Sequence, residues 1–505
     1  VDKTDMVYAL ATEGKTYFLS RPRRFGKSLL LSTLRAYFEG KKELFKGLKI
    51  DKLEKDWHVH RVFHFDFNSV NFTQPNALEE TLDYELSQWE KEYGIEAEFK
   101  NQFGLRLEKI LQVAAEQTGH GAVVLIDEYD KPLLDVLEVN PELLNNNREI
   151  LKGFYSTFKK ADAYLRFVFL TGVTKFSQVS VFSGFNQPKD ISMYEQFEAL
   201  CGITEEELHT QFAESIREMA QAENCTEEEM KLQLKKQYDG YHFSKNMTDI
   251  YNPFSVLNAF DSKDIRDFWF ATGTPTYLIR LMNHFNEGID ELTGREYSLD
   301  EFVNYKADTE YPLPMIYQSG YLTIKNYDRE MDMFLLDFPN NEVKRGFLAM
   351  VASNYLQSGQ PMDSWIKRAV LSLRRGQIDQ FRQMLTAFLA SIPYSMRRKD
   401  EERERERYFQ YTFYLLLRLM SVYTVYIEKE QSEGRVDCVI ETPQFVYIFE
   451  FKLDGTAAGA LQQIEDKGYA REYEADARPV HKIGVNFSSE TGTIEGWEHA
   501  VKLAQ

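Results

Sequence analysis

The sequence contains little cysteine and no long apolar run. Its three cysteines, Cys201, Cys225 and Cys438, lie far apart and form no CxxC pair. Neither a disulfide framework nor a cysteine-based structural zinc site is therefore indicated, and a reducing compartment, the cytoplasm, is expected. No segment reaches the roughly 18 consecutive apolar residues of a membrane span. Even the most apolar expected helix, residues 411–426, is interrupted by Arg418. We therefore expect no membrane partner.

Positive charge is also scarce. The 60 lysines and arginines are outnumbered by 79 acidic residues, which gives a formal net charge of −19. Because proteins bind phosphates mainly through lysine and arginine, any nucleic acid must bind locally, in a basic groove. The 14 prolines and 43% hydrophobic residues are typical of a folded chain. A length of 505 residues favours two to four domains.

The first 200 residues alternate short β-branched or aromatic runs with longer amphipathic segments. This alternation predicts a layered α/β domain with a largely parallel sheet. The expected strands are residues 16–20, 61–67, 122–127 and 165–171. The expected helices are residues 27–38, 77–91, 105–117 and 148–160.

The segment between the first expected strand and the first expected helix has the character of a phosphate-binding loop. A helix N-terminus offers unpaired N–H groups to phosphate, Lys27 adds positive charge, and the Ser28 hydroxyl can hold Mg²⁺. Gly26 permits a close approach of the backbone. Arg21 stands where the usual motif has its first glycine. The residues expected to bind ATP here are Arg21, Arg23, Arg24, Phe25, Gly26, Lys27, Ser28 and Leu29.

A second motif supports this interpretation about a hundred residues later. The apolar strand 122–127 ends in two adjacent carboxylates, Asp127 and Glu128. In such a site Asp127 acts through the magnesium shell, and Glu128 orients or deprotonates the attacking water as a catalytic residue. Thr171, at the end of the next strand, is placed to sense the γ-phosphate. We therefore expect binding of ATP, with GTP as the alternative, and hydrolysis.

These motifs resemble those of bacterial proteins with an AAA-ATPase-like domain at the N-terminus and a PD-(D/E)xK nuclease domain at the C-terminus. The N-terminal resemblance is carried by residues 1–4, 18–28, 126–130 and 170–177, and the likeness extends nearly end to end. In that family an arginine at the position of Arg21 is usual. The resemblance implies that a short segment precedes Val1 and that residues 201–335 form a helical lid and a small middle domain.

The last hundred residues carry a second chemistry. Expected strands at 422–427, 435–440 and 445–452 follow a helix at 408–420, and a helix at 457–473 and a strand at 482–486 come after them. This is the element order of a restriction-endonuclease-like α/β domain. Because strand side chains alternate between faces, Glu450 and Lys452 share one face, close to Asp437.

These side chains suit metal-dependent phosphodiester hydrolysis. Asp437 and Glu450 are expected to hold Mg²⁺, or Mn²⁺, and Lys452 to position the water or neutralise the phosphate. Gln463 could orient substrate or solvent. A further acidic ligand, such as Glu406, stays open. The tripeptide Glu450-Phe451-Lys452 alone is weak evidence for a nuclease, because residues 98–100 have the same sequence. The stronger evidence is the set of residues 434–437, 447–452 and 460–464, which matches the family's nuclease motifs, as do Tyr469 and residues 484–487.

Two other clusters receive less weight. His58, His60, His64 and Asp66 have the same parity on an expected strand, but polar residues at a strand start explain them better than zinc does. Residues 397–399 are basic, but acids follow at once, so a solvated helix face is favoured over phosphate binding.

We therefore expect an ATPase core at residues 1–200, a lid and middle domain at 201–335, a helical linker at 336–395 and a nuclease-like domain at 396–505. ATP is expected to gate cleavage of nucleic acid, with DNA favoured over RNA. One rival is a nucleotide-switched DNA-binding or scaffold protein whose nuclease fold does not cut, and another is a standalone ATPase motor or sensor. A homo-oligomer is possible, but neither Arg24 nor Arg166 can be assigned as an arginine finger.

Overall fold

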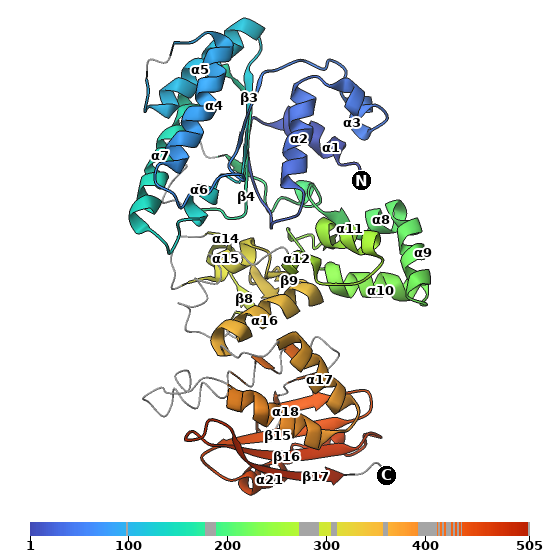
Figure 1. The fold of residues 1–505 in the computed structure, drawn as a ribbon. Helices are drawn as coiled ribbons and strands as arrows, with labels where there is room; N and C mark the ends of the chain where they lie inside the picture. The colour runs from blue at the N-terminus through green and yellow to red at the C-terminus, as the bar shows by residue number, and fades with distance from the viewer. Residues whose placement is uncertain are drawn as a thin grey trace. The chain divides into compact units, whose positions relative to one another are not determined.

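The chain divides into two compact units, Val1–Val343 and Lys344–Gln505 (Figure 1). The computed structural model describes residues 1–96, 99–176, 188–271, 292–304, 311–356, 362–391 and 437–502, together with residues 412, 415, 416, 419, 420, 426, 427, 430, 431, 434 and 435. The basic run 397–399, Glu406 and Glu98 lie outside these residues. The finer four-part division stays a prediction.

The N-terminal unit is built on a five-stranded parallel sheet in the order β2-β3-β4-β1-β5. Its strands are β1 (Thr16–Ser20), β2 (Val62–Asp66), β3 (Ala122–Asp127), β4 (Leu165–Gly172) and β5 (Lys189–Asp190). The first four were predicted from the sequence to within a residue or so at each end. Every residue of β3 is buried, as expected where helices cover both faces of a parallel sheet. The predicted α/β fold is confirmed.

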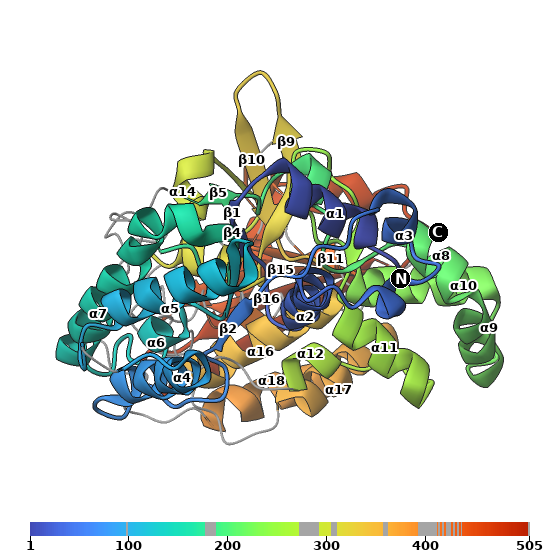
Figure 2. The same cartoon turned by 90° about the horizontal axis from the view of Figure 1, so that it is seen from above.

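Helices flank this sheet on both sides. Figures 1 and 2 show α4 (Ala77–Tyr93), α5 (Phe103–Thr118) and α7 (Pro141–Lys160) on one side, and α1 (Thr4–Glu13) and α2 (Lys27–Phe38) on the other. On α4 the leucines recur every four residues, at Leu78, Leu82 and Leu86, and all three are buried. Because the strands are parallel, their carboxyl ends meet at one edge, where ligands of such sheets bind.

A helical cluster follows the sheet. It contains α8 (Glu205–Gln211), α9 (Ala213–Ala222), α10 (Glu227–Tyr238), α11 (Pro253–Ser262) and α12 (Phe268–Ala271), with the short strands β6 (Ile203–Thr204) and β7 (Ile250–Tyr251). Capping boxes begin α8 at Thr204 and α10 at Thr226, since each threonine pairs with a glutamate three residues on.

The unit continues into a small antiparallel sheet in the order β8-β10-β9, which the sequence did not predict. Its strands are β8 (Arg295–Tyr297), β9 (Thr323–Asp328) and β10 (Met333–Asp337), accompanied by α14 (Leu299–Val303) and α15 (Leu313–Gln318). Figure 2 shows β9 and β10 as a hairpin that projects from the rest of the unit.

The C-terminal unit contains a mixed sheet in the order β11-β14-β15-β16-β17. Its strands are β11 (Tyr426–Ile427), β14 (Cys438–Glu441), β15 (Val446–Leu453), β16 (Val480–Phe487) and β17 (Ile494–Lys502). The parallel pair β15 and β16 is joined through α21 (Ala457–Asp466). Helices α17 (Met362–Arg374) and α18 (Ile378–Ser391) precede the sheet, and α16 (Asn341–Leu356) runs across the boundary between the two units.

Two boundaries in this unit differ from the sequence prediction. The helix expected over 457–473 ends at Asp466, because Gly468 takes a left-handed conformation with φ 64° and interrupts it. The last strand, β17, was not predicted, because its charged and aromatic residues show no clear apolar alternation. Within the described ranges, no helix combines the length and the apolar character needed to cross a membrane.

Gly484 fixes the position of α21 on the sheet. It pairs with Glu450 on the neighbouring strand. A Cβ atom at Gly484 would lie 2.2 Å from the Ala457 carbonyl oxygen and 2.5 Å from the Leu461 nitrogen. Paired residues on neighbouring strands point to the same face, so α21 covers the face that carries Glu450.

We expect Gly484→Ala to push α21 away from the sheet and to lower the local opening free energy of β15 and β16 by about 1–3 kcal/mol, as overpacking does. Hydrogen exchange of the full chain, followed in peptides from both strands, measures this change. Gly496→Ala should cause a smaller change, because its Cβ would come no nearer than 3.1 Å to Ala457 and 3.2 Å to Asn486. Equal exchange rates in the two variants would contradict the conclusion that Gly484 fixes the position of α21 on the sheet.

Candidate active sites

The loop between β1 and α2, where the sequence predicts phosphate binding, has an unusual backbone. Arg24 and Gly26 both take left-handed conformations, with φ 68° and 94°. Gly26 has open space around the position of a Cβ, so glycine is needed there for its backbone angle and not for lack of room. The loop ends where α2 begins, at Lys27. The N–H groups of the first turn of this twelve-residue helix are therefore available to an anion.

Lys27 is held inside this loop. Its ammonium group donates to the carbonyl oxygens of Arg21 at 3.1 Å and Pro22 at 3.2 Å. The side chain is buried, and burial lowers the pKa of Lys27. Carbonyl oxygens only partly compensate a buried cation, so an anionic group beside Lys27 would be stabilised.

Ser28, Asp127 and Thr171 come together from α2, β3 and β4. The Ser28 hydroxyl donates to Asp127 Oδ2 at 2.5 Å, and the Thr171 hydroxyl donates to Asp127 Oδ1 at 2.6 Å. The three residues supply only oxygen atoms, which are the ligands that Mg²⁺ prefers. The donor set therefore fits the magnesium ion that accompanies a nucleotide.

Glu128 directly follows this cluster and has an unusual backbone. Its φ of 51° lies in the left-handed region, which a non-glycine residue enters only at some cost. Burial raises the pKa of Glu128, and the charge of Lys27 acts in the opposite direction. A carboxylate with a raised pKa is better suited to accept a proton from water.

The side chain of Arg21 is engaged inside the protein. Its guanidinium is 1% exposed and donates to the carbonyl oxygens of Ser20 at 2.9 Å and Ser192 at 2.7 Å. It also donates to Phe197 and Glu198 carbonyls and lies 4.1 Å from the centre of the Phe243 ring. A direct contact between this guanidinium and a phosphate would require these bonds to break.

The neighbouring loop residues also contact the part of the unit that follows the sheet. The pairs are Pro22 with Gly320, Arg23 with Trp269, Arg24 with Phe254, and Phe25 with Tyr241 and Phe243. Each residue from 21 to 25 is therefore fixed by a contact that the sequence did not reveal. No periodic pattern connects these positions along the chain.

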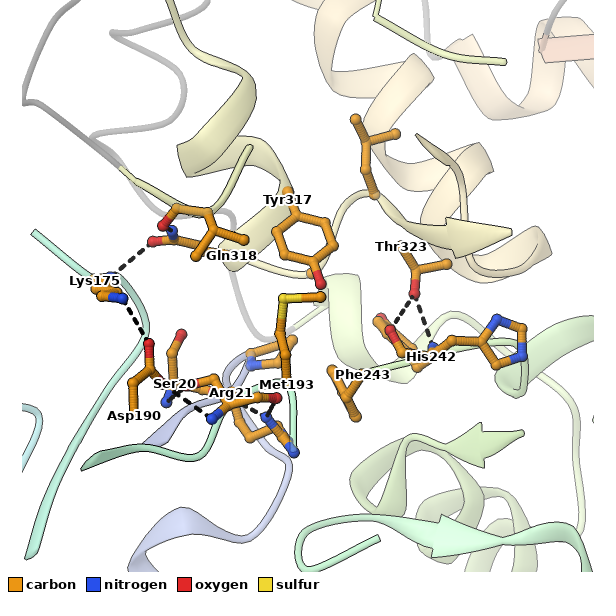
Figure 3. Close-up of a pocket in the computed structure, with 16 residues that line it drawn as sticks. Ser20, Arg21, Lys175, Asp190, Met193, His242, Phe243, Tyr317, Gln318 and Thr323 are labelled. Carbon is orange, nitrogen blue, oxygen red and sulfur yellow. Dashed lines mark hydrogen bonds and ion pairs between the residues drawn. The ribbon is translucent and has the colours of Figure 1, made fainter. Parts of the chain in front are cut away.

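A pocket lies beside Arg21 (Figure 3). Lys175 stands at its edge, where its N–H donates to Gln318 at 2.7 Å and its ammonium group contacts Asp190 at 2.8 Å. Apart from Arg21, none of the residues expected to bind nucleotide lines this pocket. The pocket therefore overlaps the predicted nucleotide site only at Arg21.

Asp130 was given no role in the sequence analysis, although it belongs to the acidic run after β3. It is buried and accepts bonds from the N–H groups of Val173 at 3.0 Å and Thr174 at 2.7 Å, and from the Thr174 hydroxyl at 2.8 Å. Burial raises the pKa of Asp130. The residue ties the loop after β3 to the loop after β4 and so fixes the spacing of Asp127 and Thr171.

The C-terminal unit brings together the four side chains that the sequence analysis named. Glu450 and Lys452 lie on β15, and Asp437, just before β14, accepts a bond from the Phe451 N–H at 2.9 Å. Gln463 on α21 accepts a bond from the Lys452 ammonium group at 2.5 Å and donates to Glu450 Oε1. The predicted shared face of Glu450 and Lys452 agrees with this arrangement.

One carboxylate oxygen of Glu450 lacks a hydrogen-bond partner. The residue is 2% exposed, and its Oε2 atom is buried without a hydrogen-bond partner. Burial, and next the negative charge of Asp437, raise the pKa of Glu450 to about 7. Lys452 lies 3.9 Å from Glu450 Oε1 and offsets this effect only in part. A divalent cation between the two carboxylates would supply the missing partner, so the donor set fits such an ion.

The histidine cluster does not form a metal centre in the structure. His60 uses its Nδ1 atom at the carbonyl oxygen of Gly121, 2.8 Å away, and His58 precedes β2. In the described part of the chain, no group of three or more His, Cys, Asp or Glu side chains has a metal-binding arrangement. The favoured structural interpretation of these histidines is consistent with both observations.

Comparison with known proteins places both sites in context. Residues 1–182 match the family described as "Predicted AAA-ATPase", and residues 404–497 match the "PD-(D/E)XK nuclease superfamily". The chain is 35% identical over 508 residues to the "Uncharacterized protein in vnfD 5'region" of Azotobacter chroococcum mcd 1, with 98% of this chain and 94% of the relative covered.

A solved structure of the Aeropyrum pernix ORC1 protein in complex with DNA matches 68% of this chain and 90% of its own, at 12% identity and a TM-score of 0.24. We infer nothing from so low a score. The full-length relative and the two domain matches confirm the resemblance noted in the sequence. The chain thus belongs to the family that it shares with this relative, in which a predicted AAA-ATPase domain precedes a domain of the PD-(D/E)XK nuclease superfamily.

Proposed function

We propose that this protein is an ATPase whose nucleotide state controls a metal-dependent nuclease in the same chain. The observation that carries the proposal is the C-terminal cluster, in which the buried Glu450 carboxylate, with its Oε2 atom unpartnered, lies beside Asp437, Lys452 and Gln463. A purely structural sheet gains nothing from a buried carboxylate with an unsatisfied oxygen. A buried carboxylate oxygen without a partner is typical of a site that binds a cation during catalysis.

In the N-terminal site, Lys27 and the first-turn N–H groups of α2 hold the phosphates of ATP. Ser28 and Asp127 hold the magnesium ion, which when bound neutralises charge on the phosphates. Glu128 orients the attacking water and accepts its proton, and Thr171 lies where a γ-phosphate can be sensed. Arg23, Arg24, Phe25 and Leu29 complete the predicted contacts, with Arg21 contributing through its backbone.

In the C-terminal site, Asp437 and Glu450 hold Mg²⁺ or Mn²⁺, which when bound activates water and stabilises the developing charge. Lys452 neutralises the scissile phosphate or positions the water. Gln463 bridges Glu450 and Lys452 and so keeps both in place on the sheet. The substrate is nucleic acid, with DNA favoured over RNA.

The nuclease proposal predicts that Lys452→Ala loses cleavage of labelled DNA by about 100-fold or more, because charge stabilisation at the phosphate is removed. Lys467→Ala, which changes an exposed lysine at the end of α21, should cleave like the wild type. Single- and double-stranded DNA and RNA are assayed with Mg²⁺ or Mn²⁺. Absence of cleavage by the wild type on all four substrates would favour the nucleotide-switched binding protein instead.

Gating predicts that ATP changes the cleavage rate of the wild type and leaves that of Lys27→Ala unchanged. The reason is that the buried ammonium group of Lys27 is needed to hold the phosphates. Cleavage rates are compared with and without ATP in both proteins. Equal rates in the wild type under the two conditions would rule out gating while leaving the nuclease intact.

The ATPase proposal predicts that Glu128→Gln binds ATP but lowers kcat for hydrolysis by about 100-fold or more, as expected for loss of a general base. Glu142→Gln, at the exposed start of α7, is the charge-matched control. Phosphate release measures hydrolysis, and calorimetry measures binding. An unchanged kcat in Glu128→Gln would remove this residue from the catalytic set.

Glu450 predicts a pH dependence of stability in the metal-free protein. Its folded-state pKa of about 7 exceeds the ordinary value of 4.5, so the folded chain keeps a proton that the unfolded chain loses. Its stabilising contribution is full below the ordinary value and is lost as the pH rises through 7. Glu450→Gln has no such proton to lose. Between about pH 5 and pH 8 it should therefore lose less protection of β15 from hydrogen exchange in EDTA than the wild type does. Parallel profiles of protection against pH in the wild type and in Glu450→Gln would show that the pKa of Glu450 is not raised by folding.

A further inference from the structure

Trp269 contacts the phosphate-binding loop from far along the sequence. Its indole Nε1 donates to the carbonyl oxygen of Arg23 at 3.0 Å, across 246 residues. The side chain is 6% exposed, and its ring packs 5.2 Å from that of Tyr321. Trp269 lies in the first turn of α12, beside α11 in both views (Figures 1 and 2). The indole therefore lies in the interior of the unit and orients one peptide group of the loop.

The orientation of that peptide group matters for phosphate binding. The Arg23 carbonyl and the Arg24 N–H belong to the same planar peptide, so they point in opposite directions. A bond from Trp269 to the carbonyl therefore also sets the direction of the Arg24 N–H. Arg24 has a φ of 68°, a conformation that is costly without outside support. Backbone N–H groups are the part of such a loop that cradles phosphates.

Glu342 holds Trp269 in turn. Its Oε1 atom accepts the backbone N–H of Trp269 at 2.7 Å, and its Oε2 atom accepts the Ser255 hydroxyl at 2.8 Å. The Glu342 side chain is 1% exposed. Ser255 follows Phe254, whose ring lies 4.8 Å from the Arg24 guanidinium carbon. One carboxylate thus joins the two helices, α11 and α12, that contact successive residues of the loop.

Glu342 also lies in the first turn of α16, the helix that begins in the N-terminal unit and continues past its last residue, Val343. We propose that Trp269 and Glu342 are positioning residues of the nucleotide site, and that they transmit its state to the start of α16. Phosphate binding reorients the Arg23–Arg24 peptide, the indole of Trp269 follows the carbonyl, and Glu342 carries the change into α16. The inference rests on the proposed nucleotide-controlled function and names the residues through which that control acts.

The first test uses the full chain and the emission of its tryptophans. Titration of the wild type with ATP and Mg²⁺ should change the emission, because the bond to Trp269 Nε1 is altered. Trp269→Phe should lose this change and bind ATP about threefold to tenfold more weakly, as expected for one lost hydrogen bond. Trp89→Phe is the matched control, because that ring packs on Phe63 and Phe65 of β2 and not on the loop. If Trp269→Phe loses thermal stability but keeps the affinity and the emission change, Trp269 has only a packing role and the inference is wrong.

The second test measures transmission to the nuclease. At saturating ATP, Glu342→Ala should bring the ratio of cleavage rates with and without ATP close to one. Ser255→Ala, which removes only one of the two partners of Glu342, should keep most of the effect. Glu342→Gln retains an acceptor for the Trp269 N–H and should therefore keep the dependence of the cleavage rate on ATP. It replaces the alanine variant in the test if that variant does not fold. An undiminished ratio in Glu342→Ala would overturn the proposal.

The two levels of failure are distinguishable. If calorimetry detects no ATP binding to the wild type, the proposed function fails and this inference fails with it. If the wild type binds ATP and shows nucleotide-dependent cleavage, and Trp269→Phe and Glu342→Ala match the wild type in both properties, only the inference fails.

Discussion

The loop between β1 and α2 depends on two buried cations that donate hydrogen bonds to backbone carbonyl oxygens. Lys27 and Arg21 lie at opposite ends of the loop between β1 and α2, and both side chains are almost fully buried. Removing such charges from water is expensive unless polar partners surround them. The partners are carbonyl oxygens of the loop itself for Lys27 and of residues 192–198 for Arg21. The loop therefore keeps its shape only when the sheet and the chain that follows it are folded together.

This constraint explains why arginine replaces the first glycine of the loop. A glycine at position 21 would leave the carbonyls of Ser192, Phe197 and Glu198 without these donors. It would also remove the cation that lies over the Phe243 ring. Arginine has five donors in a fixed planar arrangement and can serve several carbonyls at once. The arginine thus gives up the backbone freedom of glycine and attaches the loop to the rest of the unit.

The C-terminal site differs, because its buried titratable group is acidic and lacks one hydrogen-bond partner. Glu450 is a buried carboxyl group whose Oε2 atom lacks a partner, and burial raises its pKa. Gln463 satisfies its other oxygen, and the absence of a side chain at Gly484 lets α21 approach the sheet closely enough for this contact. The two sites nevertheless share one feature. Ser28 of α2 donates to the Asp127 carboxylate of β3, and Gln463 of α21 donates to the Glu450 carboxylate of β15, so in each site a helix supplies a donor to a carboxylate.

The sequence by itself determined those features that depend on local chemistry. Helix α2 and strands β1 and β3 have the predicted bounds, because their apolar runs end at unambiguous signals such as Gly26 and Asp127. The shared face of Glu450 and Lys452 follows from strand alternation alone. Only the tertiary structure decided which residues support these sites. Trp269 reaches Arg23 across 246 residues, and Gly484 matters only because α21 crosses above it. Such contacts leave no periodic trace in the sequence, because they are set by how elements pack and not by how each one forms.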